Sequence, residues 1–274
     1  MQTFVSSSGS SVGVAVAQFA PGPDTTANLD QVTQLATAAA LRGAALVVFP
    51  EYTSYFNDPM GDDFKRNAQP LDGPFVDALT ALARRLDIHI VAGLLEATDD
   101  DRRFANTAIA VDGTGLLATY RKLHLYDAFG QKESDWVLAG EIAEPETFRV
   151  GEMTVGMQTC YDLRFPEVSR RLVDAGADLF VVPSEWVRGP LKEAHWRTLV
   201  TARALENTVY IAASDQAPPI GVGNSLIVDP MGVCLASIGE AAGVAVAWVD
   251  QRRIAEVRRK NPALTLRRFR VEPA

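Results

Sequence analysis

Two segments of this chain are near copies of each other, and this likeness constrains the fold more than any other feature. GAALVVFPEY spans residues 43–52, and GADLFVVPSEW spans residues 176–186. Each is typical of a buried β-strand that follows a helix, and a similar strand precedes each helix, VGVAVAQF at 12–19 and TVGMQTCY at 154–161. The repeat predicts an α/β fold with two pseudo-symmetric β-α-β halves, mostly parallel sheets and helices outside.

The rest of the chain adds further predicted elements and two long irregular stretches. The stretches at 52–70 and 126–146 are polar and lack periodicity, which is typical of loops beside a cleft. The other predicted elements are a helix from 74, a strand at 88–94, a hairpin at 106–120, strands at 147–150 and 153–158, helices at 166–176 and 191–206, a strand at 209–213, a meander at 223–249 with a turn at 229–232, and a basic helix at 251–260.

Charge and cysteine content limit the class of protein. The 34 acidic and 26 basic residues give a net charge of −8, which argues against nucleic acid and anionic membrane surfaces as partners. No apolar run approaches the ~20 residues that a membrane span needs. Two cysteines cannot form a disulfide framework, so we predict a cytoplasmic protein. We expect one domain over 1–274, with 1–11 as a flexible N-terminus and 262–274 as a C-terminal tail.

Candidate catalytic residues follow the predicted strands, where the chemistry of open α/β sheets takes place. Glu51 and Cys160 stand at such strand ends, and Lys122 ends the hairpin. A cysteine nucleophile needs a base, which Glu51 can supply. The oxyanion of acyl transfer needs a cation and N–H donors, which Lys122 and the backbone of Tyr161 can provide. Glu133, in the long loop, is the candidate for a second carboxylate that positions the lysine or the leaving amine.

Three separated motifs together resemble one enzyme family. FPEY (49–52), YRKLHLYD (120–127) and TCYDLRFPE (159–167) are similar, in order and spacing, to the signature segments of the nitrilase superfamily of carbon–nitrogen hydrolases. HWRTLVTARALEN (195–207) and GNSLIVDPMG (223–232) also resemble family segments. The resemblance implies a four-layer αββα sandwich with neither a metal ion nor an organic cofactor. It also implies a homodimer or larger homo-oligomer, associated through helices beside the cleft.

The resemblance also assigns roles. Glu51 would be the general base, Lys122 the oxyanion stabiliser and Cys160 the nucleophile, while Glu133 matches the family's frequent second glutamate. The segment CYDLRFPE is similar to the amidase branch, which includes omega-amidases and deaminated-glutathione amidases. We therefore expect an enzyme that hydrolyses a small, carboxylate-bearing amide to acid and ammonia through a thioester. The alternatives are a nitrile or N-carbamoyl hydrolase of the same superfamily, or a catalytically silent assembly module.

Four residues are predicted to contact the substrate: Tyr52, Tyr161, Arg164 and Trp186. Arg164 can grip a substrate carboxylate with two parallel hydrogen bonds, and an ion pair with Asp162 or Glu167 is the structural alternative. For Trp186, a place in the cleft wall and simple core packing are equally compatible with the sequence.

The remaining polar candidates receive mainly structural interpretations. His124 and His195 would support a papain-like Cys–His dyad, although we expect His124 to orient the cleft loop and His195 to cap or pack its helix. No clustered Cys/His spacing predicts a metal site. Cys234 is predicted to be inert core, and Arg203 and Glu206 to form a buried ion pair.

Overall fold

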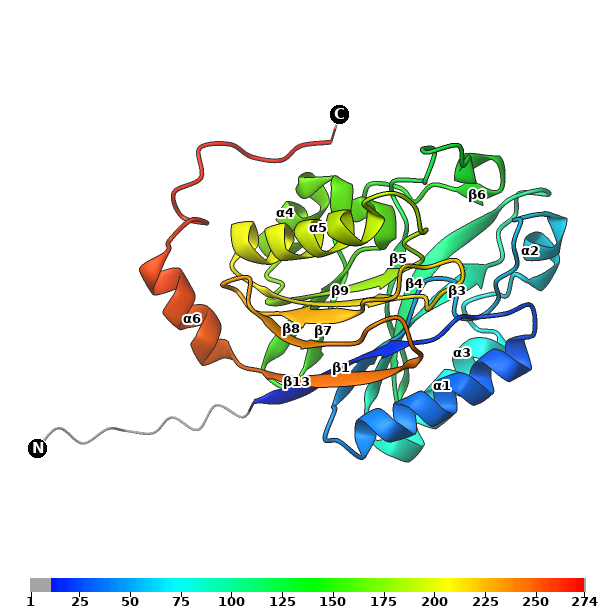
Figure 1. The fold of residues 1–274 in the computed structure, drawn as a ribbon, viewed down its shortest axis with the longest axis horizontal. Coiled ribbons are helices and arrows are strands. Elements are labelled where there is room, and N and C mark those ends of the chain that lie inside the picture. The colour runs from blue at the N-terminus through cyan, green and yellow to red at the C-terminus, as the bar shows by residue number, and fades with distance from the viewer. Residues whose placement is uncertain (1–10, 274) are drawn as a thin grey trace, which may run out of the picture.

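Two β-sheets that face each other form the centre of the computed structural model, which describes residues 11–273 (Figure 1). The first sheet has the order β13-β1-β2-β3-β4-β5, with β6 paired to β4. Its strands are β1 (Val12–Gln18), β2 (Leu46–Val48), β3 (His89–Glu96), β4 (Phe104–Asp112), β5 (Gly115–Arg121), β6 (Val137–Leu138) and β13 (Gly243–Val249). The second sheet, ordered β7-β8-β9-β10-β11-β12, contains β7 (Thr147–Val150), β8 (Met153–Met157), β9 (Leu179–Ser184), β10 (Tyr210–Asp215), β11 (Leu226–Val228) and β12 (Cys234–Ser237).

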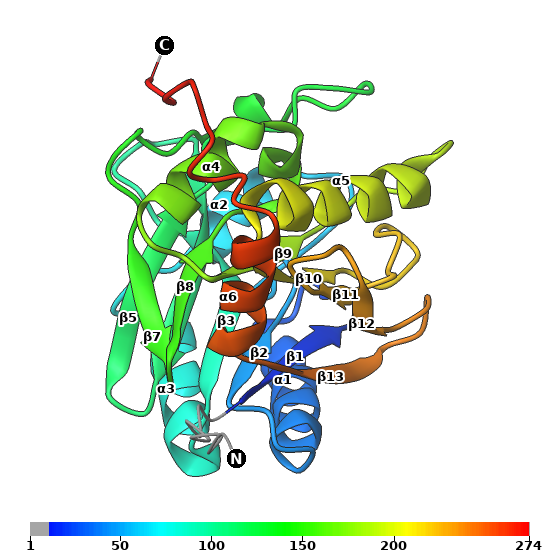
Figure 2. The same ribbon diagram turned by 90° about the vertical axis from the view of Figure 1, so that its left-hand side faces the viewer.

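Helices cover the outer face of each sheet, which confirms the four-layer αββα order (Figure 2). α1 (Thr25–Ala40) and α3 (Pro74–Leu86) pack on the first sheet, and α4 (Pro166–Asp174) and α5 (Lys192–Asn207) pack on the second. The shorter elements are α2 (Asp62–Asn67), α6 (Gln251–Lys260) and two 3₁₀ turns, η1 (Glu133–Asp135) and η2 (Cys160–Arg164).

Strand β1 shows why this sequence forms layers. Every residue of β1 is buried, so the strand has no polar face. Val14 and Val16 point into the core between the sheets, whereas Ala15 and Ala17 point into the layer shared with α1 and α3. The bulky residues therefore fill the space between the sheets, while the small ones let the helices lie close to the strand.

The two sheets repeat one pattern, as the near copies predict. In each, three parallel strands are central, β1-β2-β3 in the first sheet and β8-β9-β10 in the second. Antiparallel strands flank both trios, so the expectation of mostly parallel sheets is wrong outside the centre. The flanking strands follow hairpins or return from the other half, and neither connection requires a parallel neighbour.

Several boundaries differ from the predictions for identifiable reasons. The predicted loop 52–70 contains α2, whose six residues are too few to produce a visible periodicity. The predicted meander 223–249 divides between the sheets, because β13 pairs with β1 along its whole length. β9 continues through Pro183 rather than ending before it. At that point β8 has already ended, so Pro183 has a strand neighbour only on the β10 side.

The prediction of a buried Cys234 is wrong. Cys234 begins β12, the edge strand of the second sheet, and its side chain is exposed. Its neighbours Val233 and Leu235 are also exposed, so an apolar run does not indicate burial at this sheet edge.

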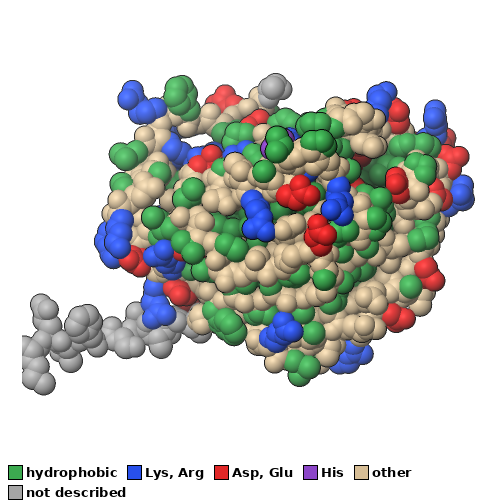
Figure 3. Space-filling model, viewed as in Figure 1, with side chains coloured by type: hydrophobic (Ala, Val, Ile, Leu, Met, Phe, Trp, Pro, Cys, Tyr) green, Lys and Arg blue, Asp and Glu red, His purple; other side chains and the backbone are tan. Residues whose placement is uncertain are grey.

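The predicted flexible N-terminus, apart from Ser11, lies outside the described residues, and residues 262–273 of the C-terminal tail contain no helix or strand. Between residues 11 and 273, no helix is both long and apolar enough to cross a membrane. Side chains of both charges are interspersed on the face shown in Figure 3.

Candidate active site

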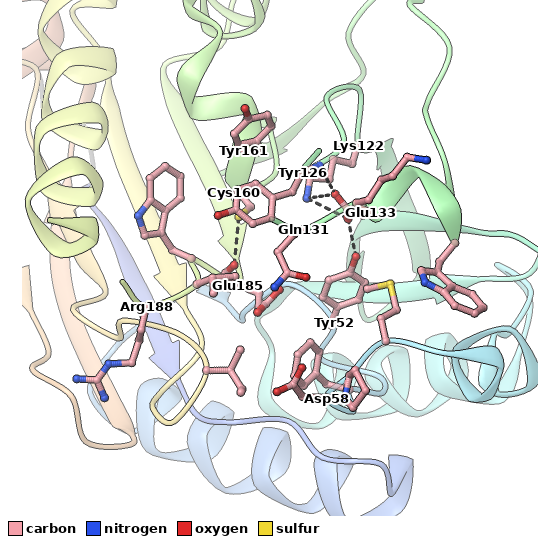
Figure 4. Close-up of a pocket in the computed structure, with 18 of the residues that line it drawn as sticks. Tyr52, Asp58, Lys122, Tyr126, Gln131, Glu133, Cys160, Tyr161, Glu185 and Arg188 are labelled. Atoms are coloured by element: carbon pink, nitrogen blue, oxygen red, sulfur yellow. Dashed lines mark hydrogen bonds and ion pairs between the residues drawn. The ribbon is translucent and has the colours of Figure 1, made fainter. Parts of the chain in front are cut away.

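The carboxyl ends of four strands meet around one cavity of about 470 Å³ (Figure 4). Lys122 follows β5, Cys160 follows β8 and Glu185 follows β9, and all three line the cavity. Glu51, which follows β2, lies just beneath them and is in contact with Lys122. The cavity wall also includes Tyr52, Tyr126, Glu133, Tyr161, Arg164, Trp186 and Lys192.

A close approach of backbone fixes the turn that carries Glu51. Gly93 of β3 donates its N–H to the carbonyl of Pro50 at 3.1 Å. A Cβ atom at Gly93 would lie 2.4 Å from the backbone nitrogen of Tyr52, so only glycine fits beside this turn. Tyr52 adopts a positive φ of 59°, so the chain turns sharply directly after Glu51, which is buried.

Lys122 lies between two carboxylates. Its Nζ donates to Glu51 Oε1 at 2.9 Å and to Glu133 Oε2 at 2.9 Å and Oε1 at 3.1 Å. The three residues are exposed by 2%, 1% and 7% respectively, so the ion pairs are shielded from solvent. Burial alone would lower the pKa of Lys122, but the charges of Glu133 and Glu51 raise it well above its ordinary value. The lysine is therefore a fixed cation.

Further hydrogen bonds hold the two carboxylates in place. Asn106 Nδ2 donates to Glu51 Oε1 at 2.6 Å and to Glu133 Oε1 at 3.1 Å, and so links them. Glu133 also accepts from the Tyr52 hydroxyl and the Tyr126 backbone N–H, both at 2.6 Å. Although burial would raise the pKa of Glu133, the Lys122 charge and these bonds lower it. Glu133 is thus ionised and rigidly held.

Cys160 stands at the first position of η2 in a left-handed conformation, with φ of 46°. A non-glycine residue in this region costs about 1–3 kcal/mol, and such strain is concentrated at functional sites. The Cys160 Sγ contacts the carbonyl oxygen of Glu185 at 3.5 Å. Burial and the negative charge of Glu51 raise the pKa of the Cys160 thiol, against the opposing effect of Lys122. The thiol is therefore protonated at rest and must lose its proton when it attacks.

Asp162 organises the turn after Cys160. Its carboxylate accepts from the Thr159 N–H at 3.1 Å and from the Tyr120 hydroxyl at 2.7 Å. It also lies 2.8 Å from His124 Nδ1, and the His124 ring stacks on Phe165 with centroids 3.6 Å apart. His124 thus orients the loop.

The second histidine does not face the thiol either. His195 Nδ1 lies 3.5 Å from an Arg164 nitrogen. Among the described residues, neither His124 nor His195 forms a hydrogen bond with Cys160, so the geometry provides no Cys–His dyad.

The predicted substrate-contact residues all line the cavity, in different settings. The hydroxyl of Tyr52 donates to Glu133, as described above. Arg164 stacks over the rings of Tyr161 and Trp186, with its Cζ 5.9 Å and 4.9 Å from their centroids. Within residues 11–273 it forms no ion pair with Asp162, whose oxygens are engaged elsewhere, or with Glu167. The expected ion pair of Arg203 with Glu206 is present at 2.9 Å, and Glu206 is partly exposed.

Four residues of the site were not predicted: Asn106, Tyr126, Glu185 and Lys192. The sequence repeat could have identified Glu185. This residue precedes the aromatic residue in PSEW (183–186), as Glu51 does in PEY (50–52). Its backbone N–H donates to Glu51 Oε2 at 2.7 Å. Tyr126 lies within the segment YRKLHLYD but carried no predicted role, and Asn106 and Lys192 come from a strand and a helix start that match no motif. Among residues 11–273, no group of three His, Cys, Asp or Glu side chains is arranged to hold a metal ion.

Comparison with known proteins agrees with this geometry. The carbon-nitrogen hydrolase family matches residues 13–259. The deaminated glutathione amidase of Escherichia coli O157:H7 is 38% identical over 256 residues, which are 93% of this chain and 97% of that one. The corresponding enzyme of Synechocystis sp. is 32% identical, with the same coverage of both chains.

Solved structures show the same fold. Saccharomyces cerevisiae Nit3, a member of branch 10 of the nitrilase superfamily, superposes with a TM-score of 0.81 at 28% identity, over 94% of this chain and 97% of that one. An amidase from Nesterenkonia sp. gives a TM-score of 0.77 at 26% identity, with the same coverage of both chains. This chain therefore belongs to the carbon–nitrogen hydrolase family of the nitrilase superfamily and is a hydrolase of carbon–nitrogen bonds.

Proposed function

We propose that this chain is a cysteine-dependent amidase that hydrolyses a small, carboxylate-bearing amide through a thioester. The observation that carries the proposal is the buried cation of Lys122, held between Glu51 and Glu133 beside the strained Cys160. The relatives named deaminated glutathione amidase and the amidase structure support an amide as the substrate.

Acylation begins with the neutral thiol. As the Cys160 Sγ attacks the carbonyl carbon, its proton passes to the Glu51 carboxylate. The Lys122 ammonium and the backbone N–H of Tyr161 stabilise the oxyanion that forms. The intermediate then collapses, the carbon–nitrogen bond breaks, and Glu51 returns the proton to the departing nitrogen. The products of this half-reaction are a Cys160 thioester and ammonia or an amine.

Deacylation uses the same groups in a second cycle. A water molecule enters the position that the amine has left, and Glu51 removes its proton as the oxygen attacks the thioester carbon. The second oxyanion forms at the same carbonyl, so Lys122 again opposes its charge. Collapse breaks the carbon–sulfur bond and releases the carboxylic acid, and the proton on Glu51 restores the thiol. Glu133 and Asn106 hold Glu51 and Lys122 throughout.

The proposal also covers the size of the substrate, the location of the enzyme and its oligomeric state. The small cavity suits a metabolite-sized amide. We place the enzyme in the cytoplasm on the basis of its two cysteines, neither of which is in a disulfide bond. We also propose a homodimer or larger homo-oligomer, as the family resemblance implies.

A substrate screen with a nucleophile variant tests the proposal. The panel contains simple amides, ω-amides of dicarboxylic acids, nitriles and ureido compounds, and released ammonia or amine is measured. We expect turnover of an ω-amide, and Cys160→Ala should remove all but about 0.1% of it while the Tm stays unchanged. Turnover of nitriles or ureido compounds alone would assign another reaction of the superfamily. Activity retained in Cys160→Ala would show that Cys160 is not the nucleophile.

A further inference from the structure

A second buried lysine lies in the cavity, away from the Glu51–Lys122–Glu133 cluster. Lys192 is the first residue of α5, lines the same cavity as Cys160, and is only 5% exposed. Its Nζ donates to the Tyr126 hydroxyl at 2.8 Å. An ammonium group has three N–H donors, and no other hydrogen bond of this group is formed within residues 11–273.

Arg164 shares the aromatic surroundings of Lys192. The Lys192 Nζ lies 4.5 Å from the Phe129 centroid and 5.4 Å from that of Trp186. The Arg164 Cζ lies 5.4 Å and 4.9 Å from the same two centroids. The Trp186 indole N–H also donates to the backbone carbonyl of Lys192 at 3.0 Å, which fixes the ring against α5. Two cations thus converge on one aromatic wall.

Neither cation has an anionic partner. Within the described chain, no carboxylate lies at ion-pair distance from Lys192 or Arg164, and the buried Nε of Arg164 forms no hydrogen bond. Burial lowers the pKa of Lys192, and the like charge of Arg164 adds to the effect. Cation–π contacts offset part of the desolvation of two cations but do not neutralise them. An anion placed between them would satisfy both.

We propose that Lys192 is a specificity-determining residue that binds the substrate carboxylate together with Arg164. This inference rests on the proposed function and extends it by naming a second contact. Arg164 offers a planar fork of donors, and Lys192 offers two unused N–H groups held in place by Tyr126. The substrate class is therefore an amide whose acyl chain carries a carboxylate at its far end, and neutral amides of equal length lack this contact.

The test compares two amides of equal chain length. Glutaramate carries a terminal carboxylate, and pentanamide ends in a methyl group. Lys192→Met keeps the length of the side chain. It also leaves in place the hydrogen bond from the Trp186 indole N–H to the backbone carbonyl of residue 192. We expect kcat/KM for glutaramate to fall about 10- to 100-fold, mainly through KM, because one charge-assisted contact is lost. The value for pentanamide should change less than about threefold. Lys192→Arg should restore much of the glutaramate value.

A matched control removes the same charge elsewhere. Lys132 lies at the cavity rim and already pairs with Asp135 at 2.8 Å, so Lys132→Met should leave the preference for glutaramate unchanged. Equal losses of Lys192→Met on both amides, or no loss on either, would overturn the inference while the amidase function stands. Equal losses confined to kcat would instead place Lys192 at the reacting carbonyl.

A binding measurement separates the two proposals. Calorimetry of Cys160→Ala with glutarate requires no turnover, so it decides the inference even if no amide is hydrolysed. We expect glutarate to bind, and to bind at least about tenfold more weakly when Lys192→Met is added. Absence of glutarate binding to Cys160→Ala, or binding that Lys192→Met leaves unchanged, would reject the carboxylate site.

Discussion

Glu51 and Glu185 stand at equivalent places in the two halves of the molecule, shortly after the ends of β2 and β9. The Glu51 carboxylate accepts hydrogen bonds from Lys122, from Asn106 and from a backbone N–H. The Glu185 carboxyl group accepts none from residues 11–273, and it lines the cavity (Figure 4). Burial, and then the negative charge of Glu51, raise the pKa of Glu185 well above its ordinary value.

The difference shows how a repeated scaffold acquires one active site. The first half carries a long hairpin, β4–β5, which supplies Asn106 and Lys122 to Glu51. The corresponding strands of the second half, β11 and β12, have three and four residues. Glu185 therefore contributes its backbone, an N–H to Glu51 and a carbonyl to the Cys160 thiol, rather than its side chain. The groups that surround each carboxylate, and not its position in the repeat, distinguish Glu51, the base that we propose, from Glu185.

Lys122→Met would remove the feature that separates the two carboxylates, and we expect it to lower both activity and stability. The rate should fall by about 10² to 10³, the usual effect of losing an oxyanion donor. Two buried carboxylates would also lose their cation, which typically costs about 3–5 kcal/mol. Thermal unfolding and kcat/KM of the variant measure the two effects separately. An unchanged Tm would show that the Glu51–Lys122–Glu133 cluster contributes little to stability.

The stability loss of Lys122→Met should depend on pH with a defined sign. The wild-type pKa of Glu133 is lowered, so its contribution is present above the unfolded pKa and is lost as pH falls through the folded value. Without Lys122, the largest effect that lowers this pKa is lost while burial remains, so the folded pKa of Glu133 rises relative to wild type. The stability difference between the two proteins therefore grows as pH rises. The Tm difference between the two proteins should therefore be larger at pH 8 than at pH 5, and the reverse order would contradict this electrostatic account.

Titration of the Cys160 thiol should show a smaller effect, and it also compares Glu51 with Glu185. Glu51 raises the pKa of Cys160 more than Glu185 does, so Glu51→Gln should move the pH profile of Cys160 alkylation by iodoacetamide to lower pH. Glu185→Gln should shift it in the same direction by less. Peptide mass spectrometry follows each cysteine separately, and the exposed Cys234 serves as an internal control whose profile should not move. A larger shift in Glu185→Gln would reverse the roles assigned to the two carboxylates.

Local patterns in the sequence predicted much of this molecule. The strand predicted within 12–19 is observed at 12–18, and helix 251–260 has the predicted bounds, because a continuous apolar run and a basic segment before Asn-Pro are local signals. The assignment of β13 to the first sheet could not be predicted. Its partner β1 lies more than 220 residues earlier in the chain, and no local pattern records that pairing.

Some residues of the candidate site could likewise be predicted from local motifs, and others could not. Glu51, Lys122 and Cys160 stand at strand ends within motifs, so the sequence placed them near one another, and the roles assigned to them remain predictions. Lys192 reaches the cavity only through the packing of α5, and Asn106 reaches Glu51 and Glu133 only through the register of β4. A lysine that begins a helix, or an asparagine within a strand, looks like any exposed polar residue until tertiary contacts are known.

The most direct test of the account is a comparison of Glu51→Gln with Glu185→Gln on the amide that the wild-type enzyme hydrolyses fastest. Both changes keep the side-chain shape and remove one ionisable group. We predict that Glu51→Gln lowers kcat/KM by about 10² to 10⁴, as expected for loss of a general base. Glu185→Gln should stay within about threefold of wild type. Equal losses in the two variants, or a greater loss in Glu185→Gln, would contradict the assignment of Glu51 as the base.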